Sequence, residues 1–145
     1  MTIRQAGRQD LSTFIRLALL LWPENDPDAL TAEFAPLLDS PDAAVFFCEA
    51  DGQAVGFAQC QLRRDYVEGC ETSPVGYLEG VFIEEAHRRM GAARSLVAAC
   101  QDWARRQGCR VFASDCELDN TDSLRFHLGI GFEEANRIIC FTKRL

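Results

Sequence analysis

Two arginines followed by small residues form a turn whose chemistry suits anion binding. The turn and the helix start expected after it comprise Arg88, Arg89, Met90, Gly91, Ala92 and Ala93. The first backbone N–H groups of a helix have no acceptor within the helix, and the helix dipole places partial positive charge there. Small residues let a phosphate approach these groups, and arginines add charge. The pattern predicts a phosphate site, although basic residues and glycine also meet at such turns without any ligand.

Two carboxylates, Glu79 and Asp115, stand where amine chemistry could take place. Glu79 interrupts the apolar run from Tyr77 to Ile83, and Asp115 ends the strand expected next along the chain. A carboxylate accepts charge-assisted hydrogen bonds from an ammonium group and can also take its proton. Open α/β sheets bind ligands beyond the carboxyl ends of their strands, which favours Asp115. The alternatives are that Glu79 faces solvent and that Asp115 belongs to a turn or a helix cap.

The elements that must position these residues follow from the hydrophobic periodicity. Strands are expected at residues 2–6, 43–49, 54–63, 76–83, 110–115 and 138–142, and helices at 10–22, 29–38, 91–107 and 120–128. Asp10 can cap the first helix, Pro23 ends it, and Asp51-Gly52 is a strong hairpin signal. The order predicts an α+β fold with a mixed sheet flanked by helices. A right-handed crossover should make the strands at 76–83 and 110–115 parallel.

The composition indicates one globular domain that spans residues 1–145. The chain is 48% hydrophobic and 26% charged, which excludes disordered and fibrous classes. No apolar run reaches the length of a membrane span and no secretion signal is visible, so we expect a cytoplasmic protein without membrane partners. The net charge of −7 argues against nucleic acid; it suits a cationic substrate but serves solubility equally. The seven cysteines lack metal-ligand spacing, so we expect free thiols and no metal.

Two motifs at a suitable separation identify a family that this chain resembles. The motifs are Arg88-x-x-Gly91-x-Ala93 and Asn120-x-x-Ser123-x-x-x-His127-x-x-x-Gly131-Phe132. Together they resemble the pyrophosphate loop and the later signature of the GNAT superfamily of acyl-CoA N-acyltransferases. More narrowly, nearly the whole chain is similar to the short aminoglycoside 6'-N-acetyltransferases. The loop segments that carry this similarity are Leu21-Trp22-Pro23, Arg64 to Cys70, Ser73-Pro74, Leu78-Glu79-Gly80, Ala113-Ser114-Asp115 and Gly131 to Glu134.

The resemblance implies a GNAT fold in which the sheet splays and acetyl-CoA, as co-substrate, enters the gap. Backbone groups of Val81, Phe82 and Ile83 would then hold the pantetheine arm, and the amides from Arg88 to Ala93 the pyrophosphate. Asn120 would bind the pantetheine, unless it only caps a helix. His127 stands where the superfamily usually has a tyrosine that acts as general acid, and it can either donate a proton or only pack against acetyl-CoA.

The resemblance also implies direct acetyl transfer to the 6'-amine of aminoglycoside antibiotics, which confers resistance. Trp22, Tyr66, Glu79 and Asp115 would contact the drug, since aromatic rings suit sugars and carboxylates suit amines. Asp115 is the better base candidate of the two, whereas Trp22 and Tyr66 can also be plain core residues. Asn136 stands where relatives carry an acidic contact, and it supplies no charge. Relatives form homodimers, so we expect one here.

Two alternative functions remain open at this point. The first keeps the chemistry but transfers the acetyl group to a polyamine, an amino acid or a protein N-terminus. The second is a non-catalytic acyl-CoA-binding module, against which the pair Glu79 and Asp115 argues.

Overall fold

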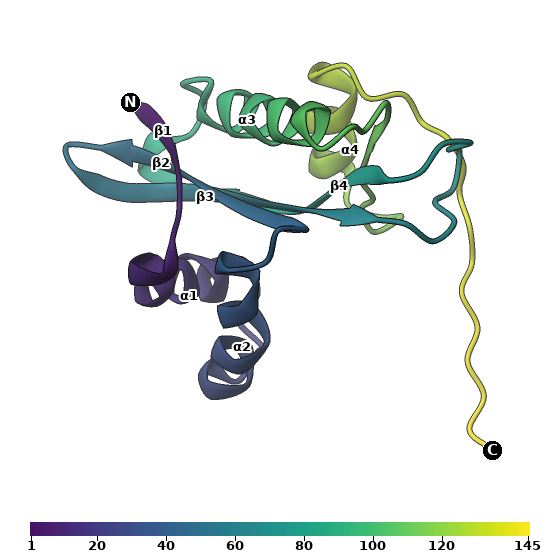
Figure 1. Ribbon diagram of the computed structural model, residues 1–145, viewed down its shortest axis with the longest axis horizontal. Coiled ribbons are helices and arrows are strands. Elements are labelled where there is room, and N and C mark those ends of the chain that lie inside the picture. Colours follow the sequence, from purple (N-terminus) through teal and green to yellow (C-terminus); the bar gives the residue numbers. More distant parts are fainter.

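The computed structural model describes residues 1–145 and contains one sheet with helices on both faces (Figure 1). The strands, in the order β1-β2-β3-β4-β5 across the sheet, are Thr2–Gln5, Ala43–Ala50, Gln53–Arg63, Val75–Ile83 and Phe112–Ala113. Neighbours from β1 to β4 are antiparallel, and β5 is parallel to β4. The expected mixed sheet and the parallel crossover partner are therefore confirmed.

Four α-helices cover this sheet in two layers. They are α1 (Leu11–Leu21), α2 (Pro27–Phe34), α3 (Ala92–Arg106) and α4 (Thr121–Gly129), with short 3₁₀ turns at Arg8–Asp10, Ala35–Leu38 and Glu85–His87. Helices α1 and α2 lie on one face, and α3 and α4 lie on the other (Figure 1). The periodicity thus identified every helix, with ends displaced by a few residues.

The two layers enclose two separate apolar cores, one on each face of the sheet. Phe14 and Leu17 of α1 meet Phe47 and Phe57 of the sheet, and all four are fully buried. On the opposite face, α3 presents its apolar stripe to the strands, with Leu96 among its fully buried residues. Each such side chain contributes about 1.5–3 kcal/mol by leaving water. The alternation of side chains along β2 and β3 supplies both faces at once.

The hairpin between β2 and β3 turns at the predicted dipeptide. Asp51 and Gly52 both have positive φ, 51° and 78°. Two consecutive residues with positive φ match the twist of the flanking strands, and Asp-Gly adopts this conformation readily. This turn fixes the register of the hairpin.

A β-bulge interrupts the pairing of β3 with β4 at Glu79. Gln59 pairs with Gly80 and Cys60 pairs with Leu78, so Glu79 has no partner residue on β3. A bulge of this kind bends the strand and changes which face its side chains take. Leu78 consequently packs in the α3 core, while both Glu79 and Gly80 face α1.

The strand expected at residues 138–142 does not form within the single chain. Residues 133–145 make no backbone–backbone hydrogen bond; the segment passes the loop between β3 and β4 and then extends away from the body (Figure 1). Ile138, Ile139 and Phe141 remain 65%, 77% and 88% exposed. The expectation is wrong for an isolated chain because an apolar strand pattern needs a sheet edge to pair with, and β5 is only two residues long.

The side chain of Asp10 does not cap α1 as expected. It accepts two hydrogen bonds of 2.9 Å from the Arg4 guanidinium and one of 2.8 Å from the backbone N–H of Gly7. The guanidinium is therefore the main reason that the pKa of Asp10 lies below its ordinary value of 3.8. Asp10 thereby joins β1 to the start of α1.

Replacing Asp10 with asparagine should lower the free energy of unfolding by about 1–3 kcal/mol. The asparagine side chain has only one oxygen that can accept from the guanidinium, and it carries no negative charge. Since the folded pKa is depressed, this stability is present above the ordinary carboxyl pKa and is lost as the pH falls through the folded value. Urea unfolding of wild type and Asp10→Asn at neutral and acid pH measures both effects. The matched control is Asp39→Asn, whose exposed pair with Arg8 is screened by solvent and should contribute little to stability. Equal losses in the two variants would contradict this account.

Candidate active site

Strand β4 has a free edge on the side of β5 over most of its length. The two strands pair only at Gly76 with Phe112 and at Tyr77 with Ala113, and they separate beyond that point. From Leu78 to Ile83 the backbone groups on this edge therefore lack a strand partner, while the other edge stays paired with β3. An extended ligand that carries amide groups can complete such an edge in the manner of an added strand.

The turn between β4 and α3 leaves the start of the helix open. Gly91 has a φ of 80°, and no side chain caps the helix. A Cβ added to Gly91 would meet nothing within 4 Å, so the space above the first N–H groups is clear. Arg89 and Met90 are exposed beside it, whereas Arg88 donates a 2.8 Å hydrogen bond to the carbonyl of Ile83. The open helix start and the free strand edge are thus joined by Arg88.

His127 lies on α4 and Asn120 is the N-cap residue of this helix. Both side chains hydrogen-bond to Ser123 of the same helix. Nδ1 of His127 lies 2.7 Å from the carbonyl of Ser123, and Nε2 lies 2.8 Å from Oγ of Ser114. A carbonyl only accepts, so Nδ1 carries a proton and donates to Ser123. The hydroxyl of Ser114 also donates to the carbonyl of Leu78, at 3.4 Å. The side-chain oxygen of Asn120 accepts from the N–H of Ser123, so Asn120 does cap the helix. Its amide N–H groups remain available for a ligand.

A cavity of about 390 Å³ lies between the sheet and the α1–α2 layer. Its walls include Trp22, Gln59, Gln61 and Glu79, together with Glu33 and neighbouring residues of α2. Two carboxylates and three side-chain amides, the third from Asn25, make this cavity suitable for a polar, cationic ligand. The half-buried Trp22 packs edge-on against Phe34 and Phe57, so it is both a core residue and a wall of the cavity.

Glycine at position 80 allows Trp22 to lie against β4. A Cβ at this position would stand 2.6 Å from the indole ring. The bulge makes this contact possible, since it turns Gly80 and Glu79 toward the same helix. Leu78-Glu79-Gly80 therefore acts as a structural unit: one residue in the core, one in the cavity and one beneath the indole.

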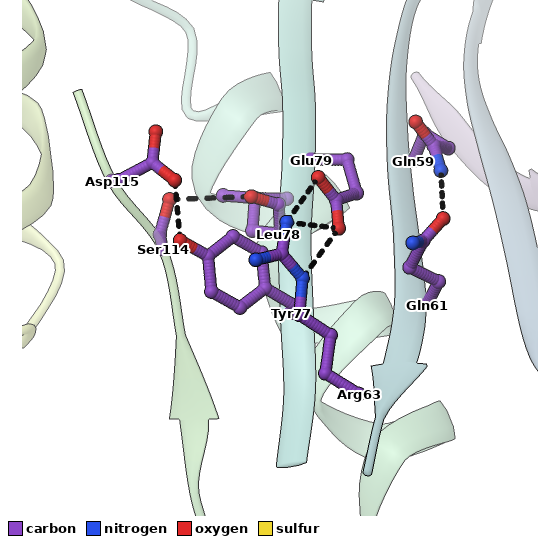
Figure 2. Close-up of polar contacts among 8 residues, drawn as sticks. All are labelled: Gln59, Gln61, Arg63, Tyr77, Leu78, Glu79, Ser114 and Asp115. Atoms are coloured by element: carbon purple, nitrogen blue, oxygen red, sulfur yellow. Dashed lines mark hydrogen bonds and ion pairs between the residues drawn. The ribbon is translucent and has the colours of Figure 1, made fainter. Parts of the chain in front are cut away.

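Glu79 is held by an arginine from the neighbouring strand (Figure 2). Nη2 of Arg63 donates to both carboxylate oxygens, at 2.8 and 2.9 Å, and Nε donates to Oε1 at 3.1 Å. The guanidinium carbon also lies 3.4 Å from the centre of the Tyr77 ring, a cation–π contact. Arg63 is thus sandwiched between Glu79 and Tyr77.

Asp115 accepts a hydrogen bond from the hydroxyl of Tyr77 (Figure 2). Burial raises the pKa of Tyr77 above its ordinary range, and the hydrogen bond to Asp115 raises it further. Tyr77 therefore stays a neutral donor, and Asp115 remains exposed at the end of β5. A continuous chain of contacts runs from Asp115 through Tyr77 and Arg63 to Glu79.

Tyr66 and Asn136 lie together, outside the walls of the cavity. Both hydrogen-bond to Glu68, at 3.3 Å from the phenol and 2.9 Å from the amide. Tyr66 is 79% exposed, so it is not a core residue. The structure thus divides the expected drug contacts into three groups: Trp22 with Glu79, Asp115 with Tyr77, and Tyr66 with Asn136.

Sequence reasoning missed four residues that hold these groups together: Arg63, Glu68, Tyr77 and Ser114. Arg63 carried a usable signal, because Gln59, Gln61 and Arg63 alternate along one strand and must share a face. The partner of Arg63 on that face, Glu79, could not be predicted, because the bulge changes the register between β3 and β4. Glu68 and Ser114 carried no periodic signal, since both lie in irregular segments.

Two features frequent in other protein classes are absent. No group of three or more His, Cys, Asp or Glu side chains lies close enough together to hold a metal ion. None of the helices combines the length and the apolar character needed to cross a bilayer.

A free strand edge that leads into an open, arginine-flanked helix start, beside an acidic cavity, would suit an N-acyltransferase, which moves an acyl group from a pantetheine thioester to an amine and releases the thiol. Comparison with known proteins agrees: the profile of the Acetyltransferase (GNAT) family matches residues 11–132. The chain belongs to this family. Its fold class and its use of acetyl-CoA, expected from the motifs, are thereby confirmed.

Curated relatives match over nearly the whole chain. The aminoglycoside N(6')-acetyltransferase type 1 of Salmonella typhimurium is 43% identical over 144 residues, which cover 99% of both chains. The protein of the same name from Serratia marcescens is 42% identical over 137 residues, 94% of each chain.

Solved structures agree with these relatives. AAC(6')-Iy in complex with the bisubstrate analogue CoA-S-monomethyl-acetylneamine has a TM-score of 0.95 and 42% identity, with 99% of this chain and 98% of that one covered. The apo enzyme AAC(6')-IG from Acinetobacter haemolyticus has a TM-score of 0.94 and 35% identity, with 100% and 99% covered.

Replacing Gly80 with alanine should lower the free energy of unfolding by about 1–3 kcal/mol, because the added methyl group overlaps the Trp22 ring and a packed core resists such insertions. Urea unfolding followed by circular dichroism measures the loss. The matched control is Gly129→Ala at the end of α4, where a Cβ meets nothing within 4 Å and φ is not positive. That variant should change stability by less than about 0.5 kcal/mol. A wild-type stability for Gly80→Ala would refute the close packing of Trp22 on β4.

Proposed function

We infer that this protein transfers the acetyl group of acetyl-CoA directly to the 6'-amine of aminoglycoside antibiotics and thereby confers resistance to them. The observation that carries this conclusion is the double use of β4, whose free edge suits the thioester substrate while Glu79 on the same strand enters an acidic cavity. Full-length relatives with this activity in their names support it. So does the 42% identical AAC(6')-Iy, solved with an analogue that joins CoA to an aminoglycoside fragment.

The residues at the free edge fit acetyl-CoA well. Backbone groups of Val81, Phe82 and Ile83 would pair with the pantetheine amides, and the amides from Arg88 to Ala93 would bind the pyrophosphate. Of these amides, that of Arg88 already donates to the carbonyl of Glu85. The co-substrate supplies an activated acetyl group, and the protein supplies orientation. Asn120 retains amide donors for the pantetheine, while His127 holds Ser114 at the end of β5.

The carboxylates account for binding and activation of the amine. An aminoglycoside carries several ammonium groups, and the reacting one must lose a proton before it can attack a carbonyl carbon. We propose that Glu79 and Asp115 hold these groups and that Asp115, exposed and hydrogen-bonded only to Tyr77, is the better base candidate. Trp22 and Tyr66 would contact the sugar rings. At Asn136 the chain has an amide, but that amide holds Glu68, so a carboxylate is still present nearby.

Purified protein mixed with acetyl-CoA and kanamycin should release free CoA well above the rate without acceptor. A thiol reagent measures the release, and mass spectrometry of the product locates the acetyl group on the 6'-nitrogen. Spermidine and a short peptide serve as comparison acceptors, and each should react far more slowly. Faster turnover of either one would replace the proposed substrate class, and binding of CoA without any turnover would indicate a non-catalytic module.

The variants Glu79→Gln and Asp115→Asn should each lower kcat/KM for kanamycin by about 10²-fold, the lower end of what a positioned acid–base group contributes. Both keep the shape of the side chain and remove only the charge. Calorimetric titration with CoA should give the wild-type affinity, because CoA would contact the helix start and the backbone of residues 81–83, and neither substituted side chain lies there. Asp102→Asn, which removes an exposed carboxylate of α3, is the matched control and should retain full activity. Full activity in either site variant would remove that residue from the proposed site.

We further propose that the protein is a homodimer in which the C-terminal segment completes its pairing against the partner chain. The exposed Ile138, Ile139 and Phe141 and the absence of backbone hydrogen bonds in this segment support the proposal, since an apolar strand is stable only when paired and covered. Residues 1–145 would form one domain in each protomer. We place the protein in the cytoplasm, because all seven cysteines are free thiols.

Light scattering should give twice the mass of one chain for the wild type and a single-chain mass for the double variant Ile139→Asp, Phe141→Asp. In the dimer, the new carboxylates would be buried in the interface without a positively charged group beside them. Burial of unpaired charges costs free energy and therefore opposes association. Leu118→Asp removes an equally exposed apolar residue outside the segment and should leave the dimer intact. A monomeric wild type, or a dimeric double variant, would contradict the proposal.

A further inference from the structure

Arg63 places a positive charge where the proposed substrate must place one. Its guanidinium makes three hydrogen bonds to Glu79, the carboxylate that enters the cavity. A carboxylate offers about four acceptor positions, and an ammonium group has three N–H donors that need acceptors. Most of the capacity of Glu79 is therefore already used before any substrate arrives.

The same guanidinium also separates the two carboxylates. It lies on the Tyr77 ring, and the hydroxyl of that ring donates to Asp115 (Figure 2). The contacts therefore place Arg63 along the path from Glu79 to Asp115. One unit of positive charge there offsets half of the negative charge that this pair supplies.

The Arg63 side chain has room to move. It is 39% exposed, in contrast to 21% for Glu79, and it is the last residue of β3 before an irregular loop. Its only hydrogen-bond partner is Glu79, so no further protein contact holds the guanidinium except the Tyr77 ring. The guanidinium can therefore move toward solvent when a ligand replaces its hydrogen bonds to Glu79.

We propose that Arg63 is a specificity-determining residue that occupies Glu79 as an internal cation and yields only to a polycationic acceptor. This inference rests on the proposed function. An acceptor with one ammonium group gains too little to exchange with the three hydrogen bonds of the guanidinium. An acceptor with several ammonium groups binds Glu79 and Asp115 together, and the two interactions offset the loss of the hydrogen bonds between Arg63 and Glu79. The ion pair thereby selects for charge number as well as for shape.

Calorimetric titration of the CoA-bound protein with kanamycin tests the inference at equilibrium, without turnover. The variants Arg63→Met and Arg63→Gln should bind kanamycin roughly three- to tenfold more tightly, the effect of one unit charge removed a few ångströms away in a partly solvated site. Arg63→Lys, which keeps the charge, should bind with nearly the wild-type affinity. Cyclohexylamine, with one ammonium group, should gain measurable binding only in the uncharged variants.

Arg64→Met is the matched control. It removes the same charge from the adjacent position, where the arginine pairs with the exposed Asp42, and should leave the Kd unchanged. In the background of Glu79→Gln, replacing Arg63 with methionine should give a smaller gain, because residue 79 then has no carboxylate to be released and only the effect on Asp115 remains. Thermal melts of each variant verify that it is folded, and Arg63→Gln replaces Arg63→Met if the latter is not.

Weaker or unchanged kanamycin binding in folded Arg63→Met and Arg63→Gln, while the wild type binds, would overturn the inference alone. A gain of equal size in Arg64→Met would also overturn it, since the effect would then be one of net charge. A wild type that neither binds nor acetylates kanamycin would overturn the proposed function, and the inference with it.

Discussion

The separation of β5 from β4 after Tyr77 is the constraint on which the rest of the site depends. Two strands that pair at only two positions leave the remainder of β4 with backbone groups that seek a partner. This free edge runs directly into the turn at Arg88 and the open start of α3. On its other edge β4 pairs with β3 except at the bulge, which turns Glu79 into the cavity. One strand therefore offers an unpaired backbone edge toward β5 and an acidic side chain in the cavity.

The acidic character of the site is balanced by the protein itself. Glu79 is neutralised by Arg63, and Asp115 accepts a hydrogen bond from a tyrosine that burial keeps protonated. Partly buried carboxylates without such partners would be costly. The same partners that make the site stable in the absence of substrate also determine what a cationic substrate must replace.

Most of the fold could be predicted from the sequence because its signals are local. The apolar stripe of α3, the alternation along β2 and β3 and the Asp51-Gly52 turn each depend on residues close together in the chain. The strand at residues 138–142 has the same kind of local signal and still does not form in the single chain. A helix satisfies its own backbone, whereas a strand needs a neighbour that no local pattern reports.

By itself the sequence determined the family, through the motifs around Gly91 and Asn120, and with it the acetyl donor; it also predicted Glu79 and Asp115 as the carboxylates of the site. Only the tertiary structure decided how these residues are held: Glu79 on a bulge beneath Arg63, Asp115 on Tyr77, and Tyr66 with Asn136 on Glu68. The reason is physical. The nature of a side chain limits what it can bind, but its partners come from distant segments that meet only when the sheet is assembled.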